Sequence, residues 1–152
     1  MPEGTALKIE EKGHVVPIRL HHAFGMPYAY SAAAAAAVGR AMQLHLVEIS
    51  DALQEYEAPA GRMRLMRGIK NSLILDDTYN AAPDSMRAAL DTFRELPARR
   101  KIAVLGDMLE IGRYAEQVHR SVGDLAAEFV NLLVTVGPRA RFIADEASHR
   151  GI

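Results

Sequence analysis

The sequence of 152 residues contains no cysteine. Disulfide bonds and thiolate zinc sites are therefore excluded, and the composition is compatible with a reducing compartment such as the cytoplasm. A large charge of either sign is also missing, since the formal net charge is −1. The chain accordingly has no basic excess of the kind that favours nucleic-acid binding.

Long hydrophobic runs are missing as well. The longest apolar stretch, residues 31–38, is mostly alanine and is far too short to cross a bilayer. Charged residues near the N-terminus, Glu3, Lys8 and Glu10, stand where a signal peptide needs an apolar segment. We therefore expect a soluble, cytoplasmic protein with no membrane partner.

Complete nucleotide-binding fingerprints do not occur in this sequence. It has neither a G-x-x-x-x-G-K-[ST] loop nor a G-x-G-x-x-G turn after a strand. The histidines show no metal-ligand spacing, so we expect no metal site from them. The length suits one domain, or one domain with part of another.

The first part of the chain predicts a hairpin followed by helices. Alternating residues around Lys12-Gly13 indicate strands near 6–10 and 15–20. Alanine favours a helix over 28–42, and a short helix is expected near 49–56 with Ser50 as its N-cap. Because an isolated hairpin is not stable in water, residues 1–58 are predicted to be the end of a preceding domain.

Residues 59–152 predict a second domain of the α/β class. A hairpin is expected around Gly68, with later strands at 101–105 and 132–136. Helical periodicity covers 83–96, 114–129 and 139–147. Continuous apolar strands between helices predict a Rossmann-like, mostly parallel sheet with helices on both faces.

Polar residues follow the predicted strands at their carboxyl ends. These ends share one edge of a parallel sheet, so Asp77, Asp107, Arg139 and Arg141 are expected to line one crevice. Acids facing guanidinium groups suit a metal-nucleotide together with an anionic co-substrate. Alternation points only one of Asp76 and Asp77 to the crevice, and we expect Asp77. Two alternatives stay open. In one, the acidic pair starts a turn or caps the following helix, and in the other, the arginines belong to a solvated helix start.

Two strings at these strand ends, Asp76-Asp77-Thr78-Tyr79-Asn80 and Gly106-Asp107-Met108-Leu109-Glu110, carry a family resemblance. With His119 and residues 134–137, they resemble the Mur ligases, in the branch that adds D-alanyl-D-alanine to the UDP-MurNAc-tripeptide of peptidoglycan synthesis. The resemblance spans residues 61–147 and implies an ATP-dependent amide ligase. This chain would then be its lid and dipeptide-binding domain, preceded by the closing segment of the central ATPase domain.

The resemblance also implies roles for individual residues, none of them catalytic. Those expected at the nucleotide, at its phosphates, ribose and neighbouring turn, are Arg62, Asp77, Tyr79 and Asn80. Those expected to face the dipeptide are Asp107, Met108, His119, Arg139 and Arg141. ATP and Mg²⁺ belong to the whole enzyme, and we expect neither to be bound tightly by this chain, nor turnover without the missing N-terminal and central domains.

The sequence departs from the family before the alanine-rich helix. Family members usually carry His-Asn and a further Asn that contact the nucleotide base, whereas this chain has Met26-Pro27 and Tyr30. Two other readings remain open. One is a receiver-like module that binds phosphate and magnesium, which a missing downstream lysine disfavours. The other is a non-catalytic remnant that forms a homo-oligomer through the hairpin and the alanine-rich helix.

Overall fold

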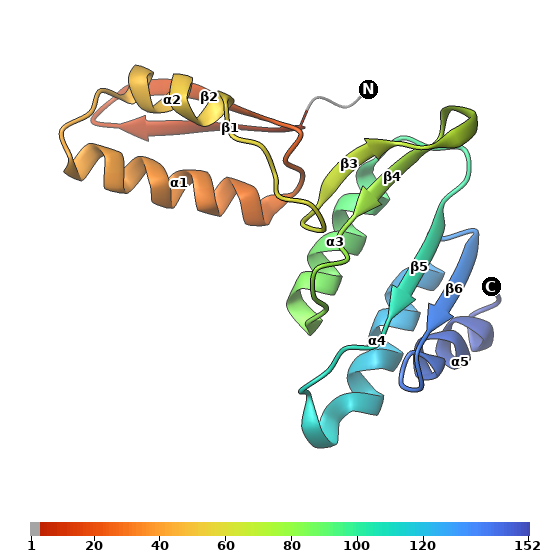
Figure 1. The fold of residues 1–152 in the computed structure, drawn as a ribbon. Coiled ribbons are helices and arrows are strands. Elements are labelled where there is room, and N and C mark those ends of the chain that lie inside the picture. Colours follow the sequence, from red (N-terminus) through yellow and green to blue (C-terminus); the bar gives the residue numbers. More distant parts are fainter. Residues whose placement is uncertain (1–3) are drawn as a thin grey trace. The chain divides into compact units, whose positions relative to one another are not determined.

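The computed structural model describes residues 4–152, which form two compact units (Figure 1). Unit 1 ends at Tyr79, and unit 2 runs from Asn80 to Ile152. The family domain boundary expected after residue 58 stays a prediction. No helix in the described part of the chain is both long and apolar enough to span a bilayer.

Unit 1 begins with the predicted hairpin. Strands β1 (Gly4–Glu11) and β2 (His14–His21) pair antiparallel. Lys12 and Gly13 make the turn with φ of 51° and 83°, a region that glycine adopts without cost. Ile18 and Leu20 point to the core, which confirms the alternation.

Helices α1 (Met26–Ala41) and α2 (Leu46–Gln54) pack on this hairpin. Small residues of α1, Ala32 and Gly39 among them, are buried. The expected N-cap at Ser50 is wrong, because α2 begins at Leu46 with His45 as its N-cap. The Glu48 carboxylate accepts a hydrogen bond from the His45 N–H at 2.8 Å and stabilises that start.

The second hairpin of unit 1 joins β3 (Arg64–Arg67) to β4 (Leu73–Asp76) through a 3₁₀ turn, η1 (Ile69–Asn71). The strands pair antiparallel, with Arg64 opposite Asp76, as the pattern around Gly68 predicts. The Gly68 N–H closes the loop by donating to the Ser72 carbonyl at 2.9 Å. β4 therefore delivers Asp76 and Asp77 directly after a paired strand.

Unit 2 contains the parallel strand pair. Its elements in chain order are α3 (Pro83–Glu95), β5 (Ile102–Gly106), η2 (Gly112–Tyr114), α4 (Ala115–Ala127), β6 (Leu132–Val136) and α5 (Arg141–His149). β5 and β6 run parallel from Ile102 opposite Leu132 to Gly106 opposite Val136. The two strands therefore end level with each other (Figure 1).

The hydrophobic core of unit 2 lies on one side of this strand pair. Alternation buries Ala103 and Leu105 against residues from α3, α4 and α5. The α/β class and the parallel pair are thus confirmed. The opposite face of β5 and β6 carries exposed aliphatic side chains, namely Ile102, Val104, Leu132, Val134 and Val136.

Candidate functional site

In unit 1, Asp76 fastens the loop that leaves β4. One carboxylate oxygen, Oδ2, accepts from the Gly61 N–H at 3.0 Å, and Oδ1 accepts from the Thr78 hydroxyl at 2.7 Å. The hydrogen bond from Thr78 is the main reason why the pKa of Asp76 lies below its ordinary value of 3.8. Asp76 is therefore an ionised anchor of the turn.

The neighbouring carboxylate, Asp77, has a different environment. Its Oδ1 accepts from the Met63 N–H at 3.0 Å. Burial raises the pKa of Asp77 above 3.8, although the Met63 N–H and the charge of Arg62 act in the opposite direction. The acidic pair thus does start a turn, and the pKa values of its two members are shifted in opposite directions.

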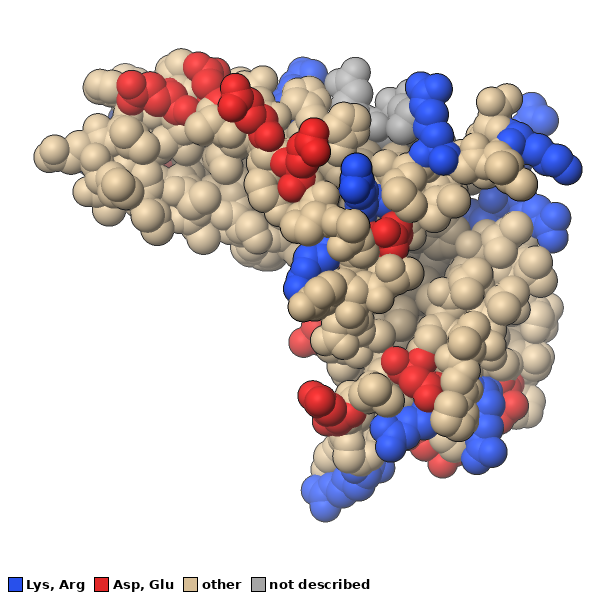
Figure 2. Space-filling view, in the orientation of Figure 1, with Lys and Arg blue, Asp and Glu red and all other residues tan. Residues whose placement is uncertain are grey.

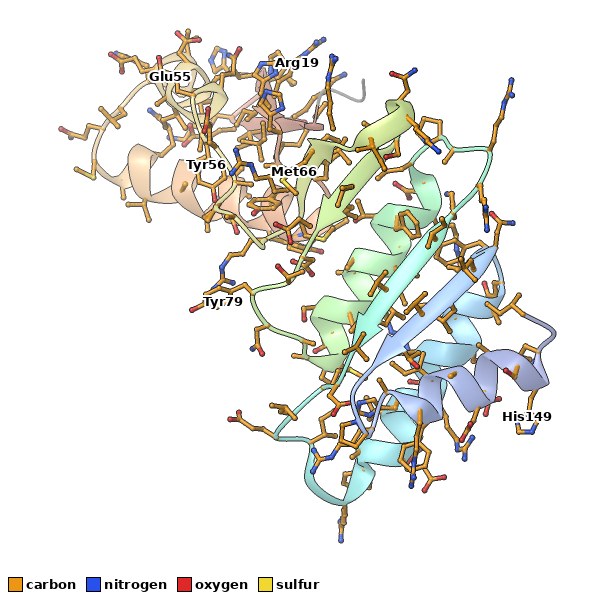
Figure 3. All side chains as sticks on the ribbon, turned by 45° about the vertical axis from the view of Figure 1, so that its right-hand side comes forward. Arg19, Glu55, Tyr56, Met66, Tyr79 and His149 are labelled. Atoms are coloured by element: carbon orange, nitrogen blue, oxygen red, sulfur yellow. The ribbon has the colours of Figure 1, made fainter. Side chains whose placement is uncertain are left out.

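Residues 61–63 lie close against this acidic turn. Gly61 has φ of +73°, and a Cβ atom at this position would lie 3.0 Å from the Tyr79 nitrogen. The Tyr79 N–H donates to the Gly61 carbonyl at 3.0 Å. The Arg62 guanidinium carbon then stands 3.9 Å from the centroid of the Tyr79 ring, a cation–π contact. Figure 3 labels Tyr79 on the loop that follows β4.

Tyr28 of α1 also holds residues 61–63 in place. Its hydroxyl donates to the Arg62 carbonyl at 2.7 Å, and its ring packs against Tyr56 with centroids 5.8 Å apart. Burial is the largest cause that raises the pKa of Tyr28 to about 12. The sequence gives no sign of this role, because only the folded chain brings Tyr28 to Arg62.

In unit 2, Asp107 joins the end of β5 to the start of α5. Its Oδ1 accepts from the backbone N–H groups of Arg139 and Ala140, at 2.9 and 2.6 Å. Gly137 makes room for this contact, because a Cβ atom there would lie 2.4 Å from the Asp107 carboxyl carbon. Asp107 therefore caps the chain that enters α5.

Met108 and His119 form a buried contact beside Asp107. Both side chains are fully buried, at 0 % exposure. The Met108 N–H donates to His119 Nε2 at 3.0 Å, and His119 Nδ1 lies 2.6 Å from the Ala115 carbonyl. Since Nε2 must accept, the proton sits on Nδ1 and is donated to Ala115.

The two arginines predicted at this edge are exposed. The backbone of Arg139 is held by Asp107, and Arg141 is the first residue of α5. The Arg141 guanidinium carbon lies 4.9 Å from the centroid of the Phe142 ring. Their positive charge is thus presented at the end of the parallel strands.

The predicted residues fall into two groups. Arg62, Asp77 and Tyr79 lie together in unit 1. In unit 2, direct hydrogen bonds join Asp107 to Arg139 and Met108 to His119. Asn80 is exposed where unit 2 begins. The shared crevice of Asp77 with Asp107 and Arg139 stays a prediction.

Within residues 4–152, no three side chains of the His, Asp and Glu types gather in a geometry that holds a metal ion. Unit 1 has an apolar cavity of about 240 Å³ whose lining includes Tyr28, Ala32 and Tyr56. A second cavity of about 340 Å³ is lined by His22, Arg64 and Met66 among others. Arg62, Asp77 and Tyr79 line neither of these two cavities.

Comparison with known proteins identifies the family. A family model described as "Mur ligase, glutamate ligase domain" matches residues 61–151. The chain belongs to the Mur ligase family. The match includes the acidic turn after β4, the level ends of β5 and β6, and the start of α5.

Curated relatives of this Mur ligase chain carry one shared name. The UDP-N-acetylmuramoyl-tripeptide–D-alanyl-D-alanine ligase of Escherichia coli is 36% identical over 115 residues, which are 75% of this chain and 25% of the relative. The ligase of that name from Bacillus subtilis is 30% identical over 149 residues, 95% of this chain and 32% of the relative. The chain therefore spans about a quarter to a third of the relatives' length.

Solved structures agree with these Mur ligase relatives. A crystal structure of MurF from Acinetobacter baumannii superposes with a TM-score of 0.83 at 30% identity, covering 94% of this chain and 31% of that one. MurF ligase from Thermotoga maritima, solved in complex with ADP, has a TM-score of 0.79 at 23% identity, covering 94% and 33%. At 23% identity, the similarity to the Thermotoga maritima structure shows a shared fold.

Proposed function

We propose that this chain provides the lid and dipeptide-binding region of a ligase that adds D-alanyl-D-alanine to the UDP-MurNAc-tripeptide. The relatives' shared name supports this assignment. The observation that carries it is the Asp107 cap, which holds the Arg139 backbone at the level ends of β5 and β6. The reaction itself is proposed for the whole protein.

The proposed chemistry is the formation of an amide from a carboxylate and an amine. Because a carboxylate is a poor electrophile, the terminal phosphoryl group of ATP is first transferred to it, giving an acyl phosphate and ADP. The dipeptide amine then attacks the carbonyl carbon, and phosphate leaves. A lid that excludes water protects the acyl phosphate from hydrolysis.

The nucleotide edge of this proposal lies in unit 1. Arg62 would approach the ATP phosphates, and Asp77 would accept a hydrogen bond from the ribose. The cation–π contact with Tyr79 and the hydrogen bond from Tyr28 support this assignment, because they hold residue 62 in one place. Asn80 would shape the turn beside the nucleotide.

The dipeptide edge lies in unit 2. The carboxylate of D-alanyl-D-alanine would pair with the guanidinium groups of Arg139 or Arg141, which offer several N–H donors in a fixed plane. The exposure of both arginines at the strand ends supports this role. The Met108 side chain belongs to the core, so its contribution to the site would come from its backbone.

Magnesium has no ligand set among the described residues, so we assign no metal role to them. ATP and magnesium are proposed as requirements of the whole enzyme, with other parts of the protein holding the metal. The proposed location is the cytoplasm, where ATP is available.

Titration calorimetry of the chain with D-alanyl-D-alanine tests the dipeptide assignment. We expect weak binding that Arg139→Ala lowers at least several-fold. Arg99→Ala removes an exposed arginine between α3 and β5, and serves as the matched control with unchanged binding. Absence of heat with the unaltered chain, or equal losses in both variants, would contradict the assignment.

A second candidate function is self-association through α1. Four large apolar side chains of α1 and its C-cap, Met26, Tyr30, Val38 and Met42, are 62, 71, 61 and 70 % exposed. At 3.6 residues per turn they spread over roughly 160° of the helix circumference, with Tyr30 and Val38 nearest its centre. Ala34 lies at the centre of this series, so an antiparallel second copy would set Ala34 against its own equivalent, with Tyr30 and Val38 flanking the contact. Figure 2 shows that the side of α1 turned to the viewer carries neither acidic nor basic atoms, and Arg40, which is the charged residue of α1, pairs with Glu11 at 2.6 Å.

Sedimentation analysis over a concentration series tests the pairing. A single pair of helices about 24 Å long buries little area, so we expect a weak dimer at high concentration. Ala34→Glu places a charge on the proposed axis and should abolish the dimer, whereas Ala98→Glu, in the exposed segment before β5, should not. A chain that stays monomeric at every concentration overturns this candidate.

A further inference from the structure

We propose that His119 and Asp107 are positioning residues that lock together the loop after β5, the first turn of α4 and the start of α5. On this proposal neither side chain is a ligand contact of unit 2. The inference rests on the proposed function in one respect, namely that Arg139 is the group being positioned. The contacts themselves are independent of that function.

His119 has no free polar atom for a ligand. Its ring is fully buried, Nε2 accepts from the Met108 N–H, and Nδ1 donates to the Ala115 carbonyl. A ligand that reached the imidazole would have to break one of these hydrogen bonds and leave a buried group unpaired, which is unfavourable. The ring therefore serves to hold the Met108 backbone against α4.

Asp107 directly precedes Met108 in the chain. One peptide group therefore links the His119 contact of Met108 to the contact of Asp107 with Arg139 and Ala140. Its Oδ1 holds the N–H groups of Arg139 and Ala140, and Ala140 is itself fully buried. The path runs from the Ala115 carbonyl through His119, the Met108 peptide and Asp107 to the chain that enters α5. Loss of the His119 side chain should therefore weaken the hydrogen bond of the Ala140 N–H, although His119 and Ala140 are not directly hydrogen-bonded in this path.

The close contact between Gly137 and Asp107 also couples the loop after β5 to the chain that enters α5. The carboxyl group of Asp107 occupies the space where a side chain at position 137 would begin. Displacing Asp107 would therefore release the Gly137–Arg139 turn together with the loop after β5. The backbone of Arg139, from which its guanidinium group extends, stays in place only while the Asp107 cap and the His119 contact are intact.

Amide hydrogen exchange on the 152-residue chain, read residue by residue by NMR, tests the proposal. His119→Ala should accelerate exchange of the Met108 and Ala140 amides at least tenfold. His119→Gln, whose amide can accept from Met108 and donate to Ala115, should restore most of the protection. Nitrogen shifts of the unaltered ring should show the proton on Nδ1.

A control separates coupling from general loosening. Val122→Ala truncates a buried side chain of α4 outside the path and should accelerate exchange across unit 2 without singling out Met108 and Ala140. The proposal is overturned by a proton on Nε2, by acceleration at Met108 without any at Ala140, or by a pattern in His119→Ala equal to that in Val122→Ala. If His119→Ala does not fold, the His119→Gln exchange pattern and the ring tautomer decide the same question.

Binding of D-alanyl-D-alanine separates this proposal from the proposed function. Failure of the unaltered chain to bind removes the dipeptide assignment and leaves the exchange results to decide the positioning role. Where the dipeptide binds, His119→Ala should weaken it about tenfold and His119→Gln should restore it. Equal loss in both variants would instead indicate direct contact and overturn the positioning role.

Discussion

At the scale of single residues, Asp76 and Asp77 are adjacent carboxylates whose pKa values are shifted in opposite directions. Hydrogen bonds lower the pKa of Asp76, and burial raises that of Asp77. Asp76 ends β4 and Asp77 follows it, so alternation predicts that the two side chains leave the chain on different sides. The sequence predicts that they differ, but their hydrogen bonds to Gly61 and Met63 depend on a segment more than ten residues away and cannot be predicted from local patterns.

Two isosteric variants should therefore change stability in different directions. Asp76→Asn loses a charged acceptor of the Gly61 and Thr78 donors and should destabilise the chain by about 1 kcal/mol at neutral pH. Asp77→Asn keeps an oxygen for Met63 and removes the cost of a buried charge, so stability should be equal or greater. Urea unfolding of both variants is the measurement, and a larger loss in Asp77→Asn would refute the assignment.

The pH dependence follows from the same two shifts. The Asp76 contribution is present above its ordinary pKa of 3.8 and is lost as the pH falls through its lowered folded value. Asp77 acts in the opposite sense. Its contribution to stability is fully present below pH 3.8 and is lost as the pH rises through its raised pKa in the folded protein. Carboxyl titration by NMR should place Asp76 below Asp77, and the reverse order would show that these causes are wrongly assigned.

Gly137 and Gly112 allow a comparison of crowding with backbone strain. Both have positive φ, at 117° and 67°, but a Cβ atom meets the Asp107 carboxyl group only at position 137, since nothing lies within 4 Å at 112. Gly112→Ala should cost about 1 kcal/mol from conformation alone. Gly137→Ala should cost about 2 kcal/mol or more, because Asp107 must also move. Thermal unfolding tests this, and equal costs would mean that Asp107 moves freely.

At the scale of secondary structure, periodicity predicts most elements of both units. The strand at 132–136 is found with its predicted bounds, and α3 begins at the predicted Pro83. The start of α2 is missed because Ser50 is a good N-cap residue by type, yet it lies inside the helix. There its hydroxyl donates to the Pro17 carbonyl of β2 at 2.8 Å, a tertiary contact that helix signals do not contain.

The crossing of α4 and α5 depends on Gly123. A Cβ atom at this position would lie 2.3 Å from the Ile143 carbonyl oxygen of α5. Gly123→Ala should therefore destabilise unit 2 by about 2 kcal/mol, although alanine alone favours a helix by about 1 kcal/mol. Gly39→Ala in α1 is the matched control, since its Cβ would meet the flexible end of the Ile49 side chain and should cost less. Calorimetric unfolding that ranks the two variants the other way would contradict this.

At the scale of the whole molecule, the described surface keeps many large apolar side chains. The continuous apolar strands β5 and β6 predict helices on both faces, whereas the described helices of unit 2 cover one face and leave Val104 and Val134 exposed on the other. Packing decides this, because α3, α4 and α5 bury Ala103 and Leu105. His119 shows a similar limit, since its sequence position on α4 does not reveal that both ring nitrogens are used inside the protein.

Replacing exposed valines of the strand pair should change the surface without changing stability. Val104 and Val134 are 67 and 43 % exposed, and threonine keeps the branched shape that strands favour. The double variant Val104→Thr, Val134→Thr should unfold at nearly the same temperature and bind less of a hydrophobic dye. Ala103→Thr, on the buried face, should instead lower the unfolding temperature, and a large loss in the double variant would show that the exposed face is packed in solution.

The Asp107 cap has a consequence for inhibitor chemistry. A compound with an acid group aimed at the turn that enters α5 meets the N–H groups of Arg139 and Ala140, which are already satisfied by a carboxylate of the protein. Its acid would have to displace that internal group before gaining any bond of its own. Medicinal effort at this end of unit 2 is better directed to the exposed guanidinium of Arg139.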